Sequence, residues 1–329
     1  MEIGKLSNKV LNDIVINTLK PKRGEVILRP AIGEDCTAFS LEEDVCVMST
    51  DPITGATLNL GKIAVNIAVN DIASCGAEPF GIMITILIPP DGEIEQLKQI
   101  MNDINQTCDS LNIDILGGHT EVTDAVTRFV ITATSVGRVK REKLVMTKNA
   151  KAGDCILMTK YVGMEGTSII INEKRKLIES FLTEDEIKMG NSFIDELSVV
   201  KEGTAASKIG VNSMHDITEG GILGAIWELC HSSQLGALVF EDKIPVREVT
   251  RKVCMYFNLN PLKLISSGSM LITCDKKHKD LLITTLLNEG INCQMIGTLS
   301  EKKDILLYNK NKVTTIMEPE SDELYKVIK

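Results

Sequence analysis

The sequence predicts a mixed α/β protein of two domains, and three observations carry this prediction. The chain has 329 residues, of which 43% are hydrophobic, so it can bury two substantial cores. In the first half, strand-like and helix-like segments alternate with long connections, as they do in sheets covered by helices. A polar, turn-rich stretch at 137–153 then separates the two halves. We therefore expect one α/β (α+β) domain at 1–150 and a second at 151–329.

The periodicity of apolar side chains locates the elements of the first domain. Residues 92–111 form the clearest amphipathic helix, and residues 62–75 form a largely apolar helix that we expect to be buried. The remaining elements are an amphipathic helix within 1–20, strands at 45–49 and 81–88, a strand leading to Gly117, and a β-branched strand at 128–136.

The second domain follows the same loose plan of strand, acidic motif and helix. Its segment 168–210 is mainly helical and highly charged, which is typical of a solvated face. The other expected elements are strands at 155–159, 269–274 and 304–308, a helix from Ile222 to about His231, and a helix at 278–289.

The composition disfavours several classes of protein. A net charge of −9 argues against a nucleic-acid binder, which usually carries a basic patch. The chain opens without a signal-peptide pattern, and no apolar run is long enough to span a bilayer. Nine cysteines are scattered without a Cys-x-x-Cys pair, which favours buried thiols in a reducing cytosol over a zinc or redox motif. We expect a cytoplasmic protein that binds neither nucleic acid nor membranes.

Five short polar motifs stand at the ends of apolar segments, and each pairs a carboxylate with small or turn-forming residues. Carboxylates hold Mg²⁺ together with substrate phosphates, and glycines let backbone N–H groups approach a phosphate. The recurrence predicts a magnesium–nucleotide site built from several segments, since the chain has neither a P-loop nor a Rossmann fingerprint. The motifs are Gly33-Glu34-Asp35, Ser49-Thr50-Asp51-Pro52, Asn70-Asp71, Gly117-Gly118-His119-Thr120-Glu121 and His215-Asp216-Ile217-Thr218-Glu219-Gly220-Gly221.

Three aspartates are the candidate metal ligands. We expect Asp35 and Asp51 on loops, and Asp71 on the buried helix, where Asn66 and Asn70 share one stripe. Each aspartate alone is compatible with an ordinary turn or cap. Together, with two asparagines in an apolar helix that need partners or a ligand, they predict a hard-cation site.

Two glycine pairs are candidate phosphate contacts. Gly117 and Gly118 follow an apolar strand, and the next residue, His119, either faces a phosphate, transfers a proton, or is an ordinary hydrogen-bonded histidine. Gly220 and Gly221 precede an apolar helix whose N-terminus favours phosphate.

The simpler reading of this last turn is an N-cap by Thr218 with Glu219 in the first helical turn. Asp216 is the more suggestive residue because it and the neighbouring His215 are two ionisable groups beside the turn. We treat Asp216 and His119 as candidate catalytic residues.

The order of these motifs resembles that of the aminoimidazole-ribonucleotide synthetase-like (PurM-like) superfamily. Within it, the chain is most similar to the hydrogenase maturation factors of the HypE group. That closer similarity rests on Ile3-Gly4-Lys5-Leu6, Ser49-Thr50-Asp51-Pro52-Ile53-Thr54-Gly55 and Asp242-Lys243-Ile244-Pro245-Val246.

The resemblance implies a fold, a cofactor and a reaction. It implies an N-terminal domain whose sheet forms a barrel across a homodimer, a C-terminal α/β domain, and ATP in a cleft lined by both. The implied reaction is ATP-dependent activation of an oxygen of a small acceptor by phosphoryl transfer. By position, the matches are Asp35, Asp51 and Asp71 to the Mg²⁺–phosphate aspartates, Gly117 and Gly118 to the turn near the nucleotide, and Asp216, Gly220 and Gly221 to the motif facing the phosphates.

The chain also departs from the pattern of these relatives. HypE carries its carbamoyl group on a C-terminal cysteine, whereas the last cysteine here is Cys293, so carbamoyl dehydration does not carry over. Ser266-Ser267-Gly268-Ser269 stands where HypE typically has Asn-Glu-Gly, which predicts the loss of a substrate-side carboxylate. The kinase members often have Asp in place of His119. The alternative to an enzyme with an unidentified acceptor is a non-catalytic nucleotide-binding or assembly protein.

Overall fold

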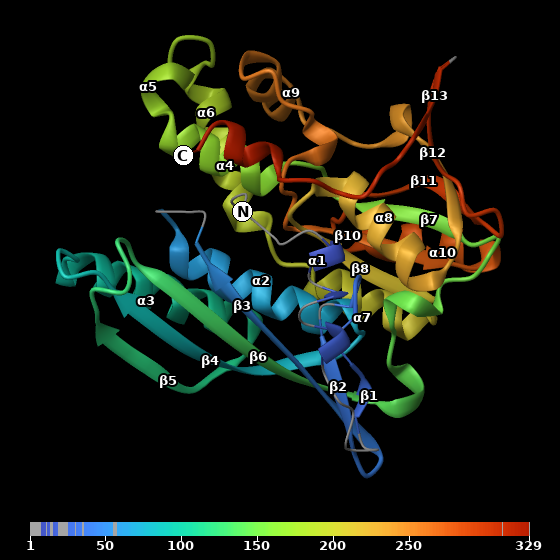
Figure 1. The fold of residues 1–329 in the computed structure, drawn as a ribbon, viewed down its shortest axis with the longest axis horizontal. Coiled ribbons are helices and arrows are strands. Elements are labelled where there is room, and N and C mark those ends of the chain that lie inside the picture. Colours follow the sequence, from blue (N-terminus) through green and yellow to red (C-terminus); the bar gives the residue numbers. More distant parts are fainter. Residues whose placement is uncertain are drawn as a thin grey trace.

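The computed structural model of the chain describes residues 8–10, 12–13, 16–18, 26–29, 31–34, 36–54, 58–310 and 312–328. Asp35 and much of the amphipathic helix expected within residues 1–20 lie outside these ranges. The described parts of that segment include a helical turn, α1 (Asn8–Val10), and a 3₁₀ turn, η2 (Ile16–Thr18). The described residues form two sheets with helices packed on them (Figure 1).

The N-terminal sheet has six strands in the order β1-β2-β3-β6-β4-β5. Neighbouring strands are antiparallel except β4 and β5, which are parallel because α3 (Ile94–Leu111) crosses over between them. α3 and α2 (Leu60–Ser74) pack on the same face of the sheet and share its core. The strands are β1 (Val26–Leu28), β2 (Thr37–Leu41), β3 (Asp44–Ile53), β4 (Glu78–Ile88), β5 (Asp114–Val122) and β6 (Val130–Lys140).

Helix α2 lies between the N-terminal sheet and the C-terminal domain (Figure 1). All of its residues are buried except Lys62 and Ile67. The hydrophobic core around it includes side chains from both domains, Ile63 and Ile104 on one side and Phe193 and Val253 on the other. The two domains therefore share a core, as the apolar character of this helix predicts.

The C-terminal sheet has seven strands in the order β13-β12-β9-β11-β7-β10-β8. It is antiparallel except for the β12–β9 pair. The strands are β7 (Cys155–Thr159), β8 (Ser213–Ile217), β9 (Gly236–Phe240), β10 (Ser269–Cys274), β11 (Cys293–Ser300), β12 (Ile305–Asn309) and β13 (Lys312–Thr315). The helices are α4 (Met164–Glu173), α5 (Arg175–Ile178), α6 (Glu184–Ser192), α7 (Val200–Ile209), α8 (Gly221–Ser233), α9 (Glu248–Tyr256) and α10 (Lys276–Asn288).

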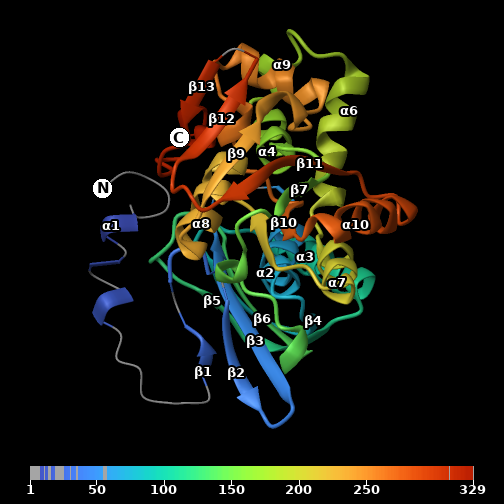
Figure 2. The same ribbon diagram turned by 90° about the vertical axis from the view of Figure 1, so that its right-hand side faces the viewer.

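Helices cover both faces of the C-terminal sheet (Figure 2). Strand β7 shows how the sequence achieves this, because alternate side chains of a strand point to opposite faces. Ile156 and Met158 join the core under α8, whereas Cys155 and Leu157 join the core under α7 and α10. A continuous apolar strand with this pattern is typical of a sheet buried on both faces.

Most predicted elements are confirmed, but several expectations were wrong. Asp51 is within β3 and not on a loop, since β3 continues to pair with β6 as far as Ile53. Gly117 and Gly118 lie inside β5, not in a turn after it. The expected linker at 137–153 begins with the end of β6 and continues through two 3₁₀ turns, η3 (Arg141–Lys143) and η4 (Thr147–Asn149). The strands β1, β2, β8, β9, β11 and β13 and the helix α9 were not predicted.

Neither sheet closes on itself within the described residues, so the barrel across a homodimer stays a prediction. Every residue of the edge strand β5 is exposed. Among the described helices, none combines the length and the apolar character needed to cross a membrane.

Candidate functional site

Asp51 and Asp71 lie at one site, as the motifs predict. Ser49, Asp51 and Ile53 alternate along β3 and face α2, which carries Asp71. The hydroxyl of Ser49 is hydrogen-bonded to Asp71 Oδ2 and lies 3.4 Å from Asp51 Oδ2. Because this hydroxyl has one proton, it donates to one carboxylate at a time and keeps the two acids close together.

These two aspartates line a cavity of about 150 Å³ between the two domains. Two more carboxylates, Glu165 and Glu219, reach it from the C-terminal domain. The lining residues include neither lysine nor arginine, so the cavity favours a cation. Its remaining walls come from Pro52, Ile53, Thr54, Ile67, Ile169, Thr218, Ile265, Ser267, Leu324 and Tyr325.

Glu165 is the most deeply buried acid of this cavity. It follows Gly163, which adopts a left-handed conformation (φ 70°) at the start of α4, and its exposed fraction is 2%. Its Oε2 atom has no hydrogen-bond partner within the described chain. Burial raises the pKa of the Glu165 carboxyl to about 7, and Ser267 acts in the opposite direction.

A C-terminal aspartate connects the last segment of the chain to the turn before α8. Asp322 accepts backbone N–H groups from Gly220 at 2.7 Å, Leu324 at 2.8 Å and Ile265 at 3.2 Å. Burial raises its pKa to about 6, and these three hydrogen bonds oppose that rise.

The glycine pair before α8 bonds within the protein. The N–H of Gly220 is donated to Asp322, and that of Gly221 to the carbonyl of Thr218 at 3.1 Å. Both glycines have left-handed φ values, and a Cβ on Gly221 would lie 2.6 Å from the carbonyl oxygen of Leu262. Close packing therefore explains Gly221 without a phosphate, and the predicted phosphate contact of this turn stays a prediction.

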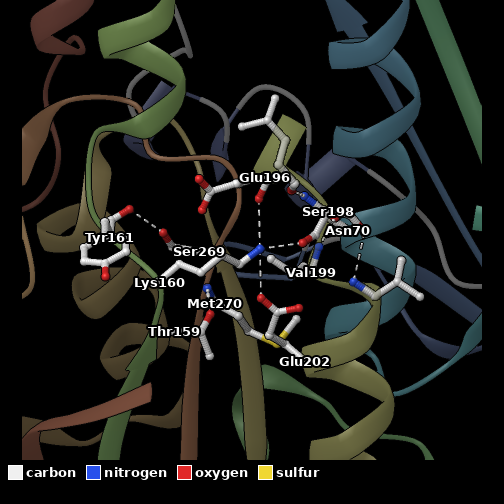
Figure 3. Close-up of polar contacts among 12 residues, drawn as sticks. Asn70, Thr159, Lys160, Tyr161, Glu196, Ser198, Val199, Glu202, Ser269 and Met270 are labelled. Carbon is white, nitrogen blue, oxygen red and sulfur yellow. Dashed lines mark hydrogen bonds and ion pairs between the residues drawn. The ribbon is translucent and has the colours of Figure 1, made fainter. Parts of the chain in front are cut away.

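Asn70 joins α2 to the segment 196–199 of the C-terminal domain (Figure 3). Its Nδ2 donates to the carbonyl of Leu197 at 2.8 Å, and its Oδ1 accepts the N–H of Val199 at 2.8 Å. Both ends of the amide are thus used between the domains. The structure gives Asn70 a structural contact where the sequence predicts a cofactor ligand.

Lys160 holds the same segment from the C-terminal side, as Figure 3 shows. Its ammonium donates to the carbonyls of Glu196 at 2.9 Å and Ser198 at 2.6 Å. It also forms a buried ion pair with Glu202 at 2.9 Å. We call residues 196–199, held by Asn70 and Lys160, the interdomain clamp.

His119 lies far from the cavity within one chain. Asp51 pairs with Ala133, Ala133 with Ile84, and Ile84 with Gly118. Three strand spacings of about 4.8 Å separate the ends of this row by about 14 Å. The side chain of His119 is 65% exposed and lies 3.2 Å from Glu121. The structure therefore does not bring His119 together with Asp51 and Asp71.

The neighbours His215 and Asp216 point to opposite faces of β8, because strand residues alternate. His215 Nε2 lies 3.0 Å from the carboxylate of Glu228 on α8. Asp216 is 2% exposed and shares the other face with Met214. It is not among the described residues that line the cavity, and its catalytic role stays a prediction.

The donor set of the cavity fits Mg²⁺, which binds through one or two carboxylates and substrate phosphates. Among the described acids, Asp51 and Asp71 best meet this requirement, because the Ser49 hydroxyl holds their two carboxylates close together. Among residues that the structure describes, no group of three or more His, Cys, Asp or Glu side chains is arranged to hold a metal. Asp35, the third predicted ligand, lies outside them.

The sequence reasoning missed Glu165 and Asp322. For Glu165 a signal existed, because Gly163-Met164-Glu165-Gly166 follows a buried strand and has the strand, glycine and carboxylate plan of the other motifs. Asp322 had none, since it lies in a polar segment distant in sequence from its partners.

The sequence and the fold both match a known family. The model of the AIR synthase related protein, N-terminal domain, matches residues 33–139, and that of the C-terminal domain matches residues 151–308. The chain belongs to the AIR synthase related family.

Its relatives include hydrogenase maturation proteins. A Methanocaldococcus jannaschii protein named for hydrogenase expression/formation is 28% identical, over 92% of this chain and 91% of the other. The carbamoyl dehydratase HypE of Bradyrhizobium diazoefficiens is 27% identical, over 73% and 69%. The selenide, water dikinase of Caldanaerobacter subterraneus is 26% identical, over 84% and 79%.

Solved structures share the fold. The hydrogenase maturation protein HypE in complex with ATP superposes with a TM-score of 0.74 at 18% identity, over 98% of this chain and 97% of the other. AaThiL complexed with AMPPCP and TMP gives a TM-score of 0.75 at 18% identity, over 96% and 99%.

Proposed function

We propose that this protein is an ATP- and Mg²⁺-dependent enzyme that transfers a phosphoryl group to an oxygen of a small acceptor. The observation that carries the proposal is the acidic cavity between the domains, where Asp51 and Asp71 converge on a wall free of basic side chains. A cavity of about 150 Å³ is smaller than the roughly 300–1,000 Å³ of ordinary ligand pockets. The cavity is large enough for the γ-phosphate, the metal ion and the reacting oxygen of the acceptor, and the rest of the nucleotide would extend beyond it.

The chain's own residues supply positioning and charge. Asp51 and Asp71 would hold Mg²⁺, with Asp35 as a third ligand by family position, and Ser49 would orient Asp71. The metal, when bound, neutralises the charge of the phosphates, which is the main catalytic contribution in phosphoryl transfer. The relatives support this reading, because they include a HypE bound to ATP and a selenide, water dikinase.

We further propose a homodimer that completes the N-terminal sheet. The edge strand β5 is exposed along its whole length, and Phe80, Met83 and Leu116 form exposed apolar surface beside it. Pairing there would place Gly117, Gly118 and His119 next to a second subunit, whose nucleotide they could approach.

Light scattering tests the homodimer. The wild type should have the mass of a dimer, twice the chain mass of 36.1 kDa, and Met83→Glu should have the mass of a monomer. Met255→Glu is the control, because Met255 is more exposed but lies on α9, away from the sheet. A monomeric wild type would contradict the proposal.

All nine cysteines are free thiols, and none has an exposed side chain. This agrees with a reducing cytoplasm, where ATP is also available. The chain has a formal net charge of −9, so we propose no nucleic-acid partner.

Nucleotide assays with Asp71→Asn test the enzyme proposal. The wild type should bind Mg-ATP and release ADP, faster with a suitable acceptor from a panel that includes carbamoylated thiols, selenide and thiamine monophosphate. Asp71→Asn should lose Mg-dependent binding, whereas Asp103→Asn, which changes a buried acid on α3, should keep it. Unchanged binding in Asp71→Asn would overturn the assignment. Tight ATP binding without turnover across the panel would favour the non-catalytic alternative.

A further inference from the structure

Glu165 stands apart from Asp51 and Asp71, the two described candidate metal ligands of the cavity. Glu165 is buried on the wall opposite β3, on a different domain from Asp51 and Asp71. One of its oxygens has no hydrogen-bond partner within the described residues. A buried carboxyl group in this state destabilises a protein, so its presence at a cavity calls for a functional explanation.

The other buried acids nearby are engaged. Asp322 accepts three backbone N–H groups, and Asp71 accepts the Ser49 hydroxyl. The loop before β10, Ser266-Ser267-Gly268-Ser269, contains no carboxylate. Glu165 on α4 is therefore the fully buried carboxyl group that the C-terminal domain contributes to this wall.

We infer that Glu165 is the general base of the reaction and that it takes the proton of the acceptor's attacking oxygen. This inference rests on the proposed phosphoryl transfer. It assigns the two walls different tasks, with the N-terminal wall binding the metal and phosphates and the C-terminal wall receiving the acceptor.

The proton and bond changes balance. As the acceptor's O–H proton moves to a Glu165 oxygen, the acceptor oxygen bonds to the γ-phosphorus. The bond from the γ-phosphorus to the bridging oxygen breaks, and its electron pair leaves with ADP. Glu165 then releases the proton to solvent, so the products are ADP, the phosphorylated acceptor and one proton.

The lining also restricts the acceptor. The apolar residues Ile169, Ile265 and Leu324 line the same cavity as Glu165, and the described lining holds no basic group to bind an anionic acceptor. An uncharged acceptor with a proton on its nucleophilic oxygen fits this wall best.

The groups that face Glu165 keep it responsive to pH. Burial is the main cause of its raised pKa, the charges of Asp322 and Glu219 raise that pKa further, and Ser267 lowers it. Asp51 and Asp71 face it across the cavity. Burial and the charges of Asp322 and Glu219 raise the pKa of Glu165 to about 7, and a base that titrates near neutral pH is well matched to proton transfer.

Turnover and binding must be separated to test the inference. With Mg-ATP and water as the acceptor, Glu165→Gln should lower phosphate release by about 100-fold or more, the usual size of a general-base effect. Its dissociation constant for Mg-ATP should stay within about two-fold of wild type. The rise of the wild-type rate through neutral pH should be absent in the variant. Asp103→Asn, a buried acid outside the cavity, controls for loss of a buried carboxyl group.

A second variant keeps the inference falsifiable if Glu165→Gln folds poorly. Glu165→Ala opens space for a small carboxylate, so added formate should restore part of its activity, and acetamide should not. Three results would each overturn the role of Glu165 as the base. They are full activity of Glu165→Gln, a loss of Mg-ATP binding in that variant as large as its loss of turnover, and a lack of rescue of Glu165→Ala by formate. If the wild type itself releases no phosphate with any acceptor, the proposed function fails. If the wild type and Glu165→Gln are both fully active, the proposed function stands and only the role of Glu165 fails.

Discussion

Replacing Glu165 with glutamine should change how the stability of the protein depends on pH. The side chain has nearly the same shape, but the amide carries no charge at any pH. In wild type, the buried carboxyl must give up its proton inside the cavity as the pH rises. That cost is absent from Glu165→Gln, so the stabilities of the two proteins should diverge as the pH rises from about 4.5 to about 7.

The size of the effect follows from the two pKa values. The pKa of Glu165 is about 7 in the folded chain and 4.5 for an ordinary glutamate. Each unit corresponds to about 1.4 kcal/mol, so the full effect is about 3 kcal/mol. Because the folded pKa is raised, the stabilisation is complete below pH 4.5 and is lost as the pH rises through 7. The residue is fully buried, so solvent screening reduces this figure little.

Urea unfolding at pH 5 and pH 8.5 measures the effect. The single tryptophan, Trp227 on α8, reports the C-terminal domain by fluorescence, and circular dichroism reports the whole chain. The free energy of unfolding of Glu165→Gln, minus that of wild type, should rise by on the order of 2–3 kcal/mol between these pH values. Groups common to both proteins cancel in this difference.

Ser267→Ala should make the free energy of unfolding depend more strongly on pH, which is the opposite of the effect of Glu165→Gln. Ser267 lowers the pKa of Glu165, so its removal should raise that pKa further and enlarge the loss of stability at high pH. If wild type and Glu165→Gln show parallel stability curves from pH 5 to 8.5, the carboxyl group is not held in a desolvated site, and the physical basis of its assignment is wrong.

Three further substitutions test the contacts around the site by urea unfolding. Lys160→Met should cost about 3–5 kcal/mol, because it leaves the buried carboxylate of Glu202 unpaired; a cost near zero would show that the pair is dispensable. Asn70→Ala should cost about 2–4 kcal/mol, since it removes two buried hydrogen bonds to backbone groups; an unchanged midpoint would refute the interdomain contact. Gly118→Ala should disrupt the pairing of β5 by overlap with the β4 backbone, whereas Gly117→Ala, whose Cβ would meet nothing within 4 Å, should be tolerated better; equal effects would contradict this geometry.

Long periodic elements could be predicted from the sequence, whereas several elements without a periodic signal could not. Helix α3 and strand β4 extend over many residues, so their apolar spacing stands out against chance. Strand β9 has five residues and begins with glycine, which gives no periodic signal of its own. Its place depends on pairing with β11 and β12, which are distant in sequence.

The same distinction divides the candidate site. Asp51 and Asp71 could be predicted because each is part of a local motif and α2 packs on β3. Glu165 was missed although its segment has the plan of the other motifs, since its burial comes from the approach of two domains and is not visible in the local sequence. His119 was misplaced for a topological reason, because β6 and β4 lie between β3 and β5 in the sheet order.

The interdomain clamp also connects domain packing to the metal site. Asn70 and Asp71 are neighbours on α2, and successive residues of a helix point in directions about 100° apart. Asn70 therefore binds the segment 196–199 while Asp71 turns toward Ser49 on β3. The rotation of α2 that makes one contact also sets the other. Lys160, which holds segment 196–199 by two carbonyls, follows β7 directly, and α4 with Glu165 begins four residues later. The two walls of the cavity are thus fixed against each other through one segment, which explains why polar residues are buried where these domains meet.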